Sequence, residues 1–395
     1  MKIVQSVVLV HRKMPNKLKV FIIAGEVSGD VLGARIMSEM TDAEFVGIGG
    51  ENMTVAGLES LFPMSDLSVM GVIEVAAHAK ILTRRIKQTV DAIIAAAPDV
   101  VLTIDSPGFA RGVISRLRRM AAGRELIARG LNFHHVVAPQ VWAWRAGRAK
   151  KYAKTFDKLY AFFDFEVPYF TKYGLDTVAV GHPIAGAILG QPERRKKQVV
   201  DEKIITMIPG SRMSEVRRLL PLMHDMARII HSCGYRGYRF AIPTVETTAE
   251  YIATEVAKWN IPVELVPADG RYDLYARTYI AIAASGTVSA ELAMMHVPAI
   301  IVYRMNPITT WLVRQVIKVR WVSLVNILLG RGVYPEFLGP AADASNIMPT
   351  FDELIIPSVR EKMTNSLRSA DDMWLRGGAD AARLIADGVR AAVNR

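Results

Sequence analysis

Short apolar runs alternate with longer helical patterns along almost the whole chain of 395 residues. This alternation is typical of parallel α/β sheets, in which each strand leads into a helix that crosses back to the next strand. We expect strands at 20–24, 44–48, 100–104, 133–137, 158–161 and 177–180, and then at 203–208, 239–243, 263–266, 279–283 and 299–303. In the first half, helices are expected at about 30–40, 72–96, 110–129, 146–155 and 164–173. The pattern predicts two doubly wound, Rossmann-like domains that face one another across a ligand cleft.

A polar stretch at 191–198 separates the two sets of strands. We therefore expect one domain at 19–190 and a second domain at 191–360, each of ordinary size. Residues 1–18 form an extension before the first strand, and residues 361–395 form helices that pack back on the first domain or on a partner. The sequence leaves the oligomeric state open, a homodimer included.

Positive charge is concentrated in one part of the chain. The formal net charge is +11, and residues 111–154 hold eleven Lys or Arg against Glu125 alone. Such a balance indicates an acidic partner, whether nucleic acid, anionic lipid or a phosphorylated metabolite. No helix-turn-helix, zinc finger or RNA-binding motif is present, so we expect no nucleic acid partner. The one cysteine, Cys233, excludes a disulfide framework and fits a reducing compartment, where it is more typical of a core residue than of a nucleophile.

An apolar stretch from Thr278 to Tyr303 contains Glu291 as its only charge. Hydropathy alone would mark it as a membrane span. However, the segments 285–287 and 296–298 divide it into strand, helix and strand, each too short to cross a bilayer. We expect no transmembrane segment.

Polar residues follow the first expected strand, in the segment 25–30. Glu26 and Asp30 would repel a pyrophosphate, so this is not a dinucleotide fingerprint, and carboxylates beside Ser28 suit sugar hydroxyls better. The alternative is a tight turn in which Ser28 or Asp30 caps the following helix.

Two further loops of the first half carry candidate residues. Asp105 lies at the end of the third strand and is well placed as a general base, although it could instead cap the next helix. After the fourth strand, Trp142 and Trp144 lie beside Arg145 and Arg148. They predict an apolar wall with a phosphate clamp, or alternatively core rings and solvated arginines.

In the second half, the loop Ser285-Gly286-Thr287 follows an apolar strand and opens a helix. Unpaired N–H groups at a helix start bind phosphates, so this loop is a candidate diphosphate site, with Glu291 on ribose hydroxyls. The alternative is a simple helix cap. The loop Gly210-Ser211-Arg212 adds close backbone approach and a cation. No metal-ligand cluster is present, so neither a metal nor another cofactor is expected.

A loop with large apolar residues, Val69, Met70, Val72 and Ile73, precedes a helix rich in Lys and Arg. This pairing is typical of proteins that dock on an anionic lipid surface without spanning it. The alternative is that these side chains belong to the core.

Several motifs occur together in one order, and their set resembles the lipid-A-disaccharide synthase family, over about residues 19–395. They are Gly25-Glu26-Val27-Ser28-Gly29-Asp30, Ala138-Pro139-Gln140-Val141-Trp142-Ala143-Trp144-Arg145, Pro209-Gly210-Ser211-Arg212, Ala284-Ser285-Gly286-Thr287, Ser323-Leu324-Val325-Asn326 and Pro335-Glu336. The resemblance implies two facing domains of the glycosyltransferase B type.

The resemblance also implies a reaction. UDP-2,3-diacylglucosamine and 2,3-diacylglucosamine 1-phosphate would be joined with inversion to a β-1,6-linked disaccharide, releasing UDP. It implies a cytoplasmic protein at the inner-membrane surface. The catalytic residues would be Asp105, as the base, and Glu26, the carboxylate that could take that role in its place. The acceptor would be bound by Ser28, Asp30, Trp142, Trp144, Arg145 and Arg148. The nucleotide sugar would be bound by Gly210, Ser211, Arg212, Ser285, Gly286, Thr287, Glu291 and Asn326. Gly108 departs from the family pattern, which usually has a second aspartate there. A UDP-sugar epimerase on the same fold is the alternative.

Overall fold

The structure is a computed structural model and describes residues 17–67, 72–142, 147–189, 203–232, 235, 237–304, 320–375 and 380–393. Most of the expected N-terminal extension lies outside these residues, as do Cys233, Val69, Met70, Trp144 and Arg145. Within them, no helix is long and apolar enough to cross a membrane.

The first domain is built on a six-stranded parallel sheet with the order β2-β1-β3-β4-β5-β6. Each strand is a short apolar run, and β3 is buried along its whole length, as expected for a sheet covered on both faces. The strands are β1 Leu18–Ala24, β2 Ala43–Ile48, β3 Val100–Ile104, β4 Asn132–Val136, β5 Lys158–Ala161 and β6 Asp176–Ala179.

The second domain repeats this plan with the order β12-β11-β10-β7-β8-β9, again with all strands parallel. Counted from β7, this is the doubly wound order 3-2-1-4-5-6. The strands are β7 Lys203–Ile208, β8 Tyr238–Pro243, β9 Val263–Val266, β10 Thr278–Ala284, β11 Ala299–Tyr303 and β12 Glu336–Leu338. The expected fold class, two Rossmann-like α/β domains, is confirmed.

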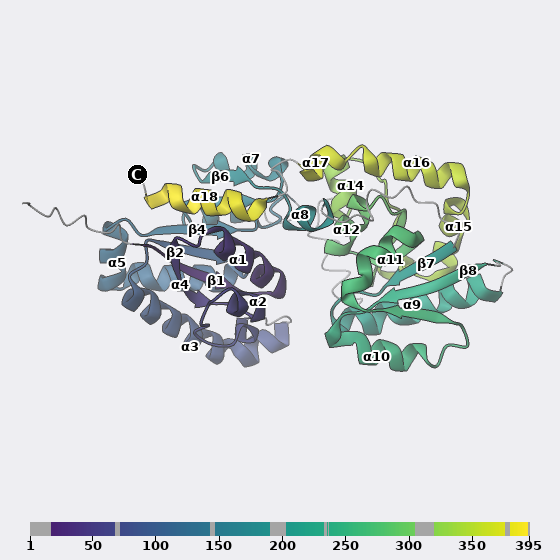
Figure 1. Ribbon diagram of the computed structural model, residues 1–395, viewed down its shortest axis with the longest axis horizontal. Coiled ribbons are helices and arrows are strands. Elements are labelled where there is room, and N and C mark those ends of the chain that lie inside the picture. The colour runs from purple at the N-terminus through teal and green to yellow at the C-terminus, as the bar shows by residue number, and fades with distance from the viewer. Residues whose placement is uncertain are drawn as a thin grey trace, which may run out of the picture.

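Helices connect the strands and cover the sheets (Figure 1). Those of the first domain are α1 Val27–Glu39, α2 Glu51–Val55, α3 Val72–Ala96, α4 Pro107–Arg119, α5 Ala121–Ala128, α6 Arg148–Ala153, α7 Pro168–Thr171 and α8 Pro183–Leu189. Those of the second part are α9 Met213–Ser232, α10 Glu246–Val256, α11 Arg271–Arg277, α12 Thr287–Met294, α14 Leu324–Leu329, α15 Ala344–Leu354, α16 Pro357–Arg368, α17 Asp371–Leu375 and α18 Ala381–Val393.

The structure corrects several expected elements. The helix expected at 110–129 is two helices, α4 and α5, because Met120 between them has an extended backbone. Gly123 makes this junction possible, since a Cβ there would lie 2.1 Å from the Leu117 carbonyl oxygen. The helix expected at 164–173 is a short 3₁₀ turn, Asp164–Glu166, followed by α7. Strand β12 was not expected at all.

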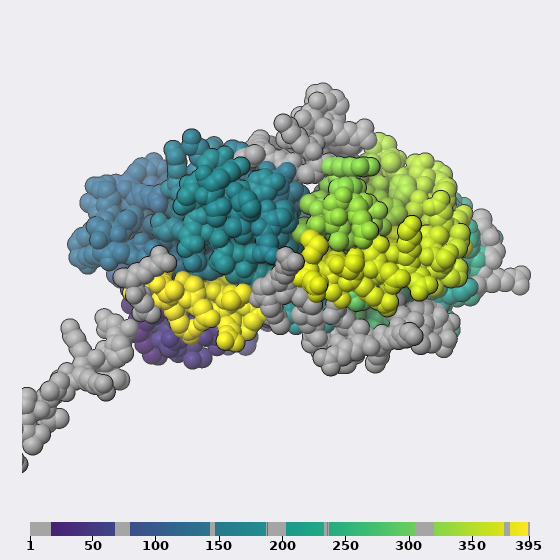
Figure 2. Space-filling view, turned by 90° about the horizontal axis from the view of Figure 1, so that it is seen from above, coloured from purple at the N-terminus to yellow at the C-terminus, as the bar shows by residue number. Residues whose placement is uncertain are grey.

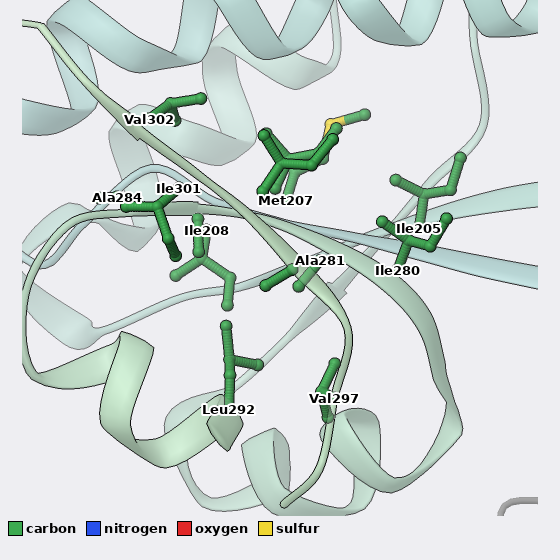
Figure 3. Close-up of a cluster of buried hydrophobic side chains, with 14 of the residues drawn as sticks. Ile205, Met207, Ile208, Ile280, Ala281, Ala284, Leu292, Val297, Ile301 and Val302 are labelled. Atoms are coloured by element: carbon green, nitrogen blue, oxygen red, sulfur yellow. The ribbon is translucent and has the colours of Figure 1, made fainter. Parts of the chain in front are cut away.

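The apolar segment around Glu291 forms β10, α12 and β11, as expected from its interruptions. Ala281 and Ala284 of β10 pack with Leu292 of α12 and Val302 of β11 in the core of the second domain (Figure 3). Small residues on β10 allow the helix to lie close against the sheet. This stretch therefore forms the centre of the hydrophobic core of the second domain.

The two domains meet through elements far apart in the sequence. Ala185 and Ile188 of α8 are buried in the core of the second domain, and the ring of Phe163 contacts Trp374 with centroids 6.0 Å apart. Helix α16 packs on the second domain, whereas the chain then returns and α18 packs on α1 (Figures 1 and 2). The C-terminal helices are thus shared between both domains.

Candidate active site between the two sheets

Ligands of doubly wound sheets bind at the carboxyl edge, where the strand order reverses. In the first sheet this point lies between β1 and β3, and in the second between β7 and β10. The loops after these four strands carry Glu26, Asp105, Arg212 and Ser285. The topology therefore brings the sequence-predicted residues to the two crevices of the molecule.

A cavity of about 550 Å³ lies between the domains at these crevices. Glu26, Ser28 and Asp105 line it from the first domain, together with Trp142. From the second domain it is lined by Gly286 and Thr287 and by residues that the sequence had not indicated. The residues missed by sequence reasoning that line the cavity include Glu166, His182, Arg271, Tyr272, Val322 and Leu324.

Asp105 is held in a strained conformation beside this cavity. Asp105, Ser106 and Val137 all have positive φ angles of 55°, 44° and 81°. A non-glycine residue in this region costs about 1–3 kcal/mol and typically marks a functional site. Gly25 allows the turn, because a Cβ there would lie 1.8 Å from the Ser106 hydroxyl oxygen. The strained backbone therefore supports the assignment of Asp105 to a functional site.

Burial raises the pKa of Asp105 to about 6, and the negative charge of Glu26 adds to the effect. A carboxylate with this pKa is a stronger base than an exposed aspartate but is still ionised at neutral pH. A Cβ added at Gly108 would meet no atom within 4 Å. The position at which the family pattern usually has its second aspartate thus faces open space in this protein.

Trp142 and Glu166 form one wall of the cavity. The indole Nε1 of Trp142 donates to Oε1 of Glu166 at 3.4 Å, and the N–H of Phe163 donates to Oε2 at 3.2 Å. Burial nevertheless raises the pKa of Glu166 to about 7. Sequence reasoning missed Glu166 because it lies in a 3₁₀ turn that the pattern predicted as plain helix.

His182 lines the cavity between the domains. Burial lowers its pKa to about 4, so its imidazole is neutral at physiological pH. Its Nδ1 accepts the Ile184 N–H at 3.3 Å, and its ring lies near those of Phe162 and Phe163. In the sequence, the segment around His182 had indicated only a domain boundary.

In the second domain, α12 begins at Thr287 directly after the Ser285-Gly286 turn. Gly286 and Thr287 line the cavity, whereas the N–H of Ser285 donates to the Val302 carbonyl at 3.2 Å. Glu291 lies one turn along, with its side chain 12% exposed, and pairs with Nε of Arg271 at 3.7 Å. Burial raises the pKa of Glu291, against the effects of Arg271 and Tyr275.

Arg271 is the cation that reaches the cavity from this side. Its guanidinium lies 4.4 Å from the Tyr272 ring centroid and donates to the Ala268 carbonyl and the Tyr272 hydroxyl. Glu291 and Tyr272 thereby hold it in place. An arginine beside a tyrosine in a short helix gave no sequence signal of a binding site.

Gly210, Ser211 and Arg212 follow β7 and precede α9, next to the Ser285 loop, because β7 pairs with β10. Gly210 has φ 107°, and a Cβ there would lie 2.5 Å from Oε2 of Glu215. Arg212 is about half exposed and pairs with Glu215 at 3.2 Å. Such an exposed pair is weak, so the guanidinium can turn to a phosphate.

Two residues predicted to bind substrate make hydrogen bonds that support the fold. Asp30 is buried and accepts the N–H groups of Gly50, Asn52 and Met53, and the Asn52 side-chain amide, at 2.7–3.1 Å. It thereby holds the start of α2 and does not line the cavity. The acceptor-binding assignment of Asp30 stays a prediction.

Asn326, predicted to bind the nucleotide sugar, makes a similar set of hydrogen bonds within the fold. It is fully buried, and its amide donates to the Tyr334 carbonyl and to Glu336 while accepting the N–H groups of Val333 and Tyr334. Glu336 in turn accepts the N–H groups of Val322 and Ser323 at 2.8 Å. These bonds use the whole capacity of the amide. The motif thus shapes the loop that brings Val322 and Leu324 to the cavity.

The remaining predicted residues lie elsewhere. Arg148 is described and lines a separate hollow with Arg111 and Lys151. Trp144, Arg145, Val69 and Met70 lie outside the described residues, and Val72 and Ile73 begin α3. Within the described ranges, no group of three or more His, Cys, Asp or Glu is arranged to hold a metal ion.

Comparison with known proteins decides the family. Residues 20–372 match the family described as Lipid-A-disaccharide synthetase. The chain belongs to this family. A lipid-A-disaccharide synthase of Rhodospirillum centenum is 40% identical over 94% of both chains, and one of Gluconobacter oxydans is 37% identical over 87% of this chain and 83% of the relative.

A solved structure supports the fold. A UDP-GlcNAc 2-epimerase of Neisseria meningitidis, bound to UDP-GlcNAc, superposes with a TM-score of 0.60 and 12% identity, covering 95% of this chain and all of that one. At this identity the likeness shows the fold alone. The family membership, not this neighbour, identifies the chain as a UDP-sugar-dependent glycosyltransferase, so the epimerase alternative is not favoured.

Proposed function

We propose that the chain transfers 2,3-diacylglucosamine from its UDP derivative to 2,3-diacylglucosamine 1-phosphate, with inversion and release of UDP. The family membership supports the reaction. The observation that carries the residue assignments is the shared cavity, in which Asp105 of one domain faces the Gly286-Thr287 turn of the other. A base on one wall and a phosphate-binding turn on the other match an inverting transfer.

On the acceptor side, Asp105 takes the proton of the acceptor 6-hydroxyl. The oxygen attacks the anomeric carbon of the donor, and the bond from that carbon to the UDP diphosphate breaks. Glu26 keeps the pKa of Asp105 raised, and Ser28 offers a hydroxyl to the sugar. Trp142 supplies an apolar wall, and Trp144, Arg145 and Arg148 complete the acceptor region.

On the donor side, the diphosphate lies on the turn Ser285-Gly286-Thr287 at the start of α12, where N–H groups and the helix dipole favour negative charge. Gly210 and Ser211 provide close backbone approach, and Arg212 turns from Glu215 to a phosphate oxygen. Arg271, oriented by Glu291, adds a second cation. Glu291 remains the carboxylate for the ribose hydroxyls.

The lipid substrates place the reaction at a membrane surface. We infer a peripheral protein on the cytoplasmic face of the inner membrane, with Val69, Met70, Val72 and Ile73 dipping into the interface. The cations of α3, among them Lys80, Arg84 and Lys87, follow this segment and suit anionic headgroups.

Acceptor-dependent release of UDP tests the proposal. A transferase releases UDP in step with disaccharide when both lipid substrates are supplied, and little without the acceptor. An epimerase would instead change the donor sugar while needing no acceptor. An epimerised donor formed without acceptor, with no net release of UDP, would replace the proposal by the epimerase alternative.

A further inference from the structure

A second hollow, in the first domain, is lined by cations. It has a volume of about 510 Å³, and Arg111 of α4 faces Arg148 and Lys151 of α6 across it, with Gly147 at its edge. Among the described residues, no carboxylate belongs to this lining. Three cations from two separate helices repel one another, so the hollow is more stable with an anion inside.

Tyr152 connects this hollow with the candidate base. Tyr152 follows Lys151 on α6, and its hydroxyl is within electrostatic reach of Arg111, Arg148 and Asp105. Tyr152 is almost fully buried, and its ring contacts His135, Phe156 and Phe170. Tyr152 is therefore held in place, with Arg111, Arg148 and Asp105 around its hydroxyl.

The chain continuity supports the same placement. Asp105 ends β3, and Arg111 lies in the second turn of α4, the helix that begins at Pro107. Nε of Arg111 donates to the Pro107 carbonyl at 3.3 Å, which ties the arginine to the start of that helix. The candidate base and Arg111 thus lie on one continuous segment, the end of β3 and the first two turns of α4.

We propose that Arg111, Arg148 and Lys151 bind the phosphomonoester of the acceptor, so that the phosphate orients the sugar with its 6-hydroxyl toward Asp105. This inference rests on the proposed function and extends it to the recognition of one substrate group. A phosphomonoester carries nearly two negative charges and three acceptor oxygens, which suits two arginines and a lysine.

An anionic lipid headgroup offers the same phosphate chemistry as the acceptor. An assay in neutral detergent micelles, which contain no anionic headgroups, separates the acceptor phosphate from the headgroup phosphate. The measured quantity is the ratio of kcat/KM for 2,3-diacylglucosamine 1-phosphate to that for the dephosphorylated 2,3-diacylglucosamine. Contacts between cationic groups and phosphate are typically worth about tenfold or more each. We expect Arg111→Gln and Lys151→Gln each to lower this ratio about tenfold, and the double variant more.

The matched control is Arg124→Gln, which removes an exposed arginine of the same basic region that does not line the hollow. It should leave the ratio unchanged, and melting curves check that every variant is folded. An unchanged ratio in folded Arg111→Gln and Lys151→Gln would overturn the inference. Loss of sedimentation with phosphatidylglycerol vesicles, at an unchanged ratio, would overturn it in favour of a headgroup site.

The wild-type protein separates this inference from the function on which it rests. If it forms no disaccharide from either acceptor, the proposed function itself fails. If it forms disaccharide with the same efficiency from both acceptors, only the phosphate site fails.

Discussion

Asp105 shows how far residue-scale reasoning reaches. Its place at a strand end predicted a base, and the structure adds burial and a left-handed backbone that no sequence pattern reveals. Asp30 and Asn326 show the limit. Both belong to motifs of the family, yet their hydrogen bonds hold loops in place. A motif marks residues that matter, but only the three-dimensional contacts separate those that bind from those that support.

The base assignment predicts the effect of Asp105→Asn. The amide cannot accept the hydroxyl proton, and general-base help is typically worth about 10² to 10⁴ in rate. Turnover should fall by that factor, while UDP affinity, measured by calorimetry, stays near that of the wild type because the donor turn lies on the other domain. Near-normal turnover would move the role to another carboxylate, with Glu26 first in line.

The raised pKa of Asp105 predicts an acid limb in the pH profile. A general base works only when it is deprotonated, so kcat/KM should fall about tenfold per pH unit below about pH 6. In Glu26→Gln the neighbouring negative charge is gone, but burial remains. The limb should therefore move to lower pH without reaching the range of an exposed aspartate. The same limb in both proteins would show that Glu26 does not act on the base.

At the scale of elements, the alternation of apolar runs predicted eleven of the twelve strands that the structure describes. The missing strand, β12, has only three residues. It forms by pairing with β11, in which Ile301 lies opposite Glu336. Long-range pairing of this kind leaves no periodicity in the sequence. The division at Met120 was missed for a related reason, since the apolar spacing continues across both α4 and α5.

The buried hydrogen bonds of Asn326 and Asp30 predict that removing either side chain lowers stability without removing the chemistry. Asn326→Ala leaves buried N–H and carboxylate groups without their partner, and Asp30→Ala removes the support of α2. Each should lower the free energy of unfolding by about 3 kcal/mol, because unsatisfied buried groups and lost caps are costly. Urea unfolding measures the loss, with exposed Asn346→Ala as the control. If Asn326→Ala keeps the stability of the wild type but binds UDP more weakly, Asn326 acts in nucleotide binding.

At the scale of the whole molecule, the two switch points and the cavity between them follow from topology. The sequence predicted two domains and a cleft, and the loops at the strand ends identified Glu26 and Asp105 of its charged lining. It could not show that Arg271, Glu166 and His182 reach the same cavity, because their approach depends on how the domains pack. The return of α18 to α1 likewise depends on tertiary packing.

Membrane attachment is a property of the whole molecule and is tested on the segment before α3. Replacing Val69, Met70 and Val72 with Ser should release the protein from anionic vesicles in a sedimentation assay, since both apolar insertion and nearby cations contribute. Val393→Ser, at a partly exposed position on α18, is the control. A lower melting temperature with unchanged sedimentation would instead place these side chains in the core.

The most direct test of the central claim is the product of the reaction. The protein is incubated with UDP-2,3-diacylglucosamine and 2,3-diacylglucosamine 1-phosphate, and the lipids are analysed by mass spectrometry and by NMR of the new anomeric centre. We predict one tetraacyl disaccharide 1-phosphate with a β-1,6 linkage, formed in equal amount to the UDP released. An α-linked product would contradict direct attack assisted by Asp105, and no disaccharide at all would contradict the transfer itself.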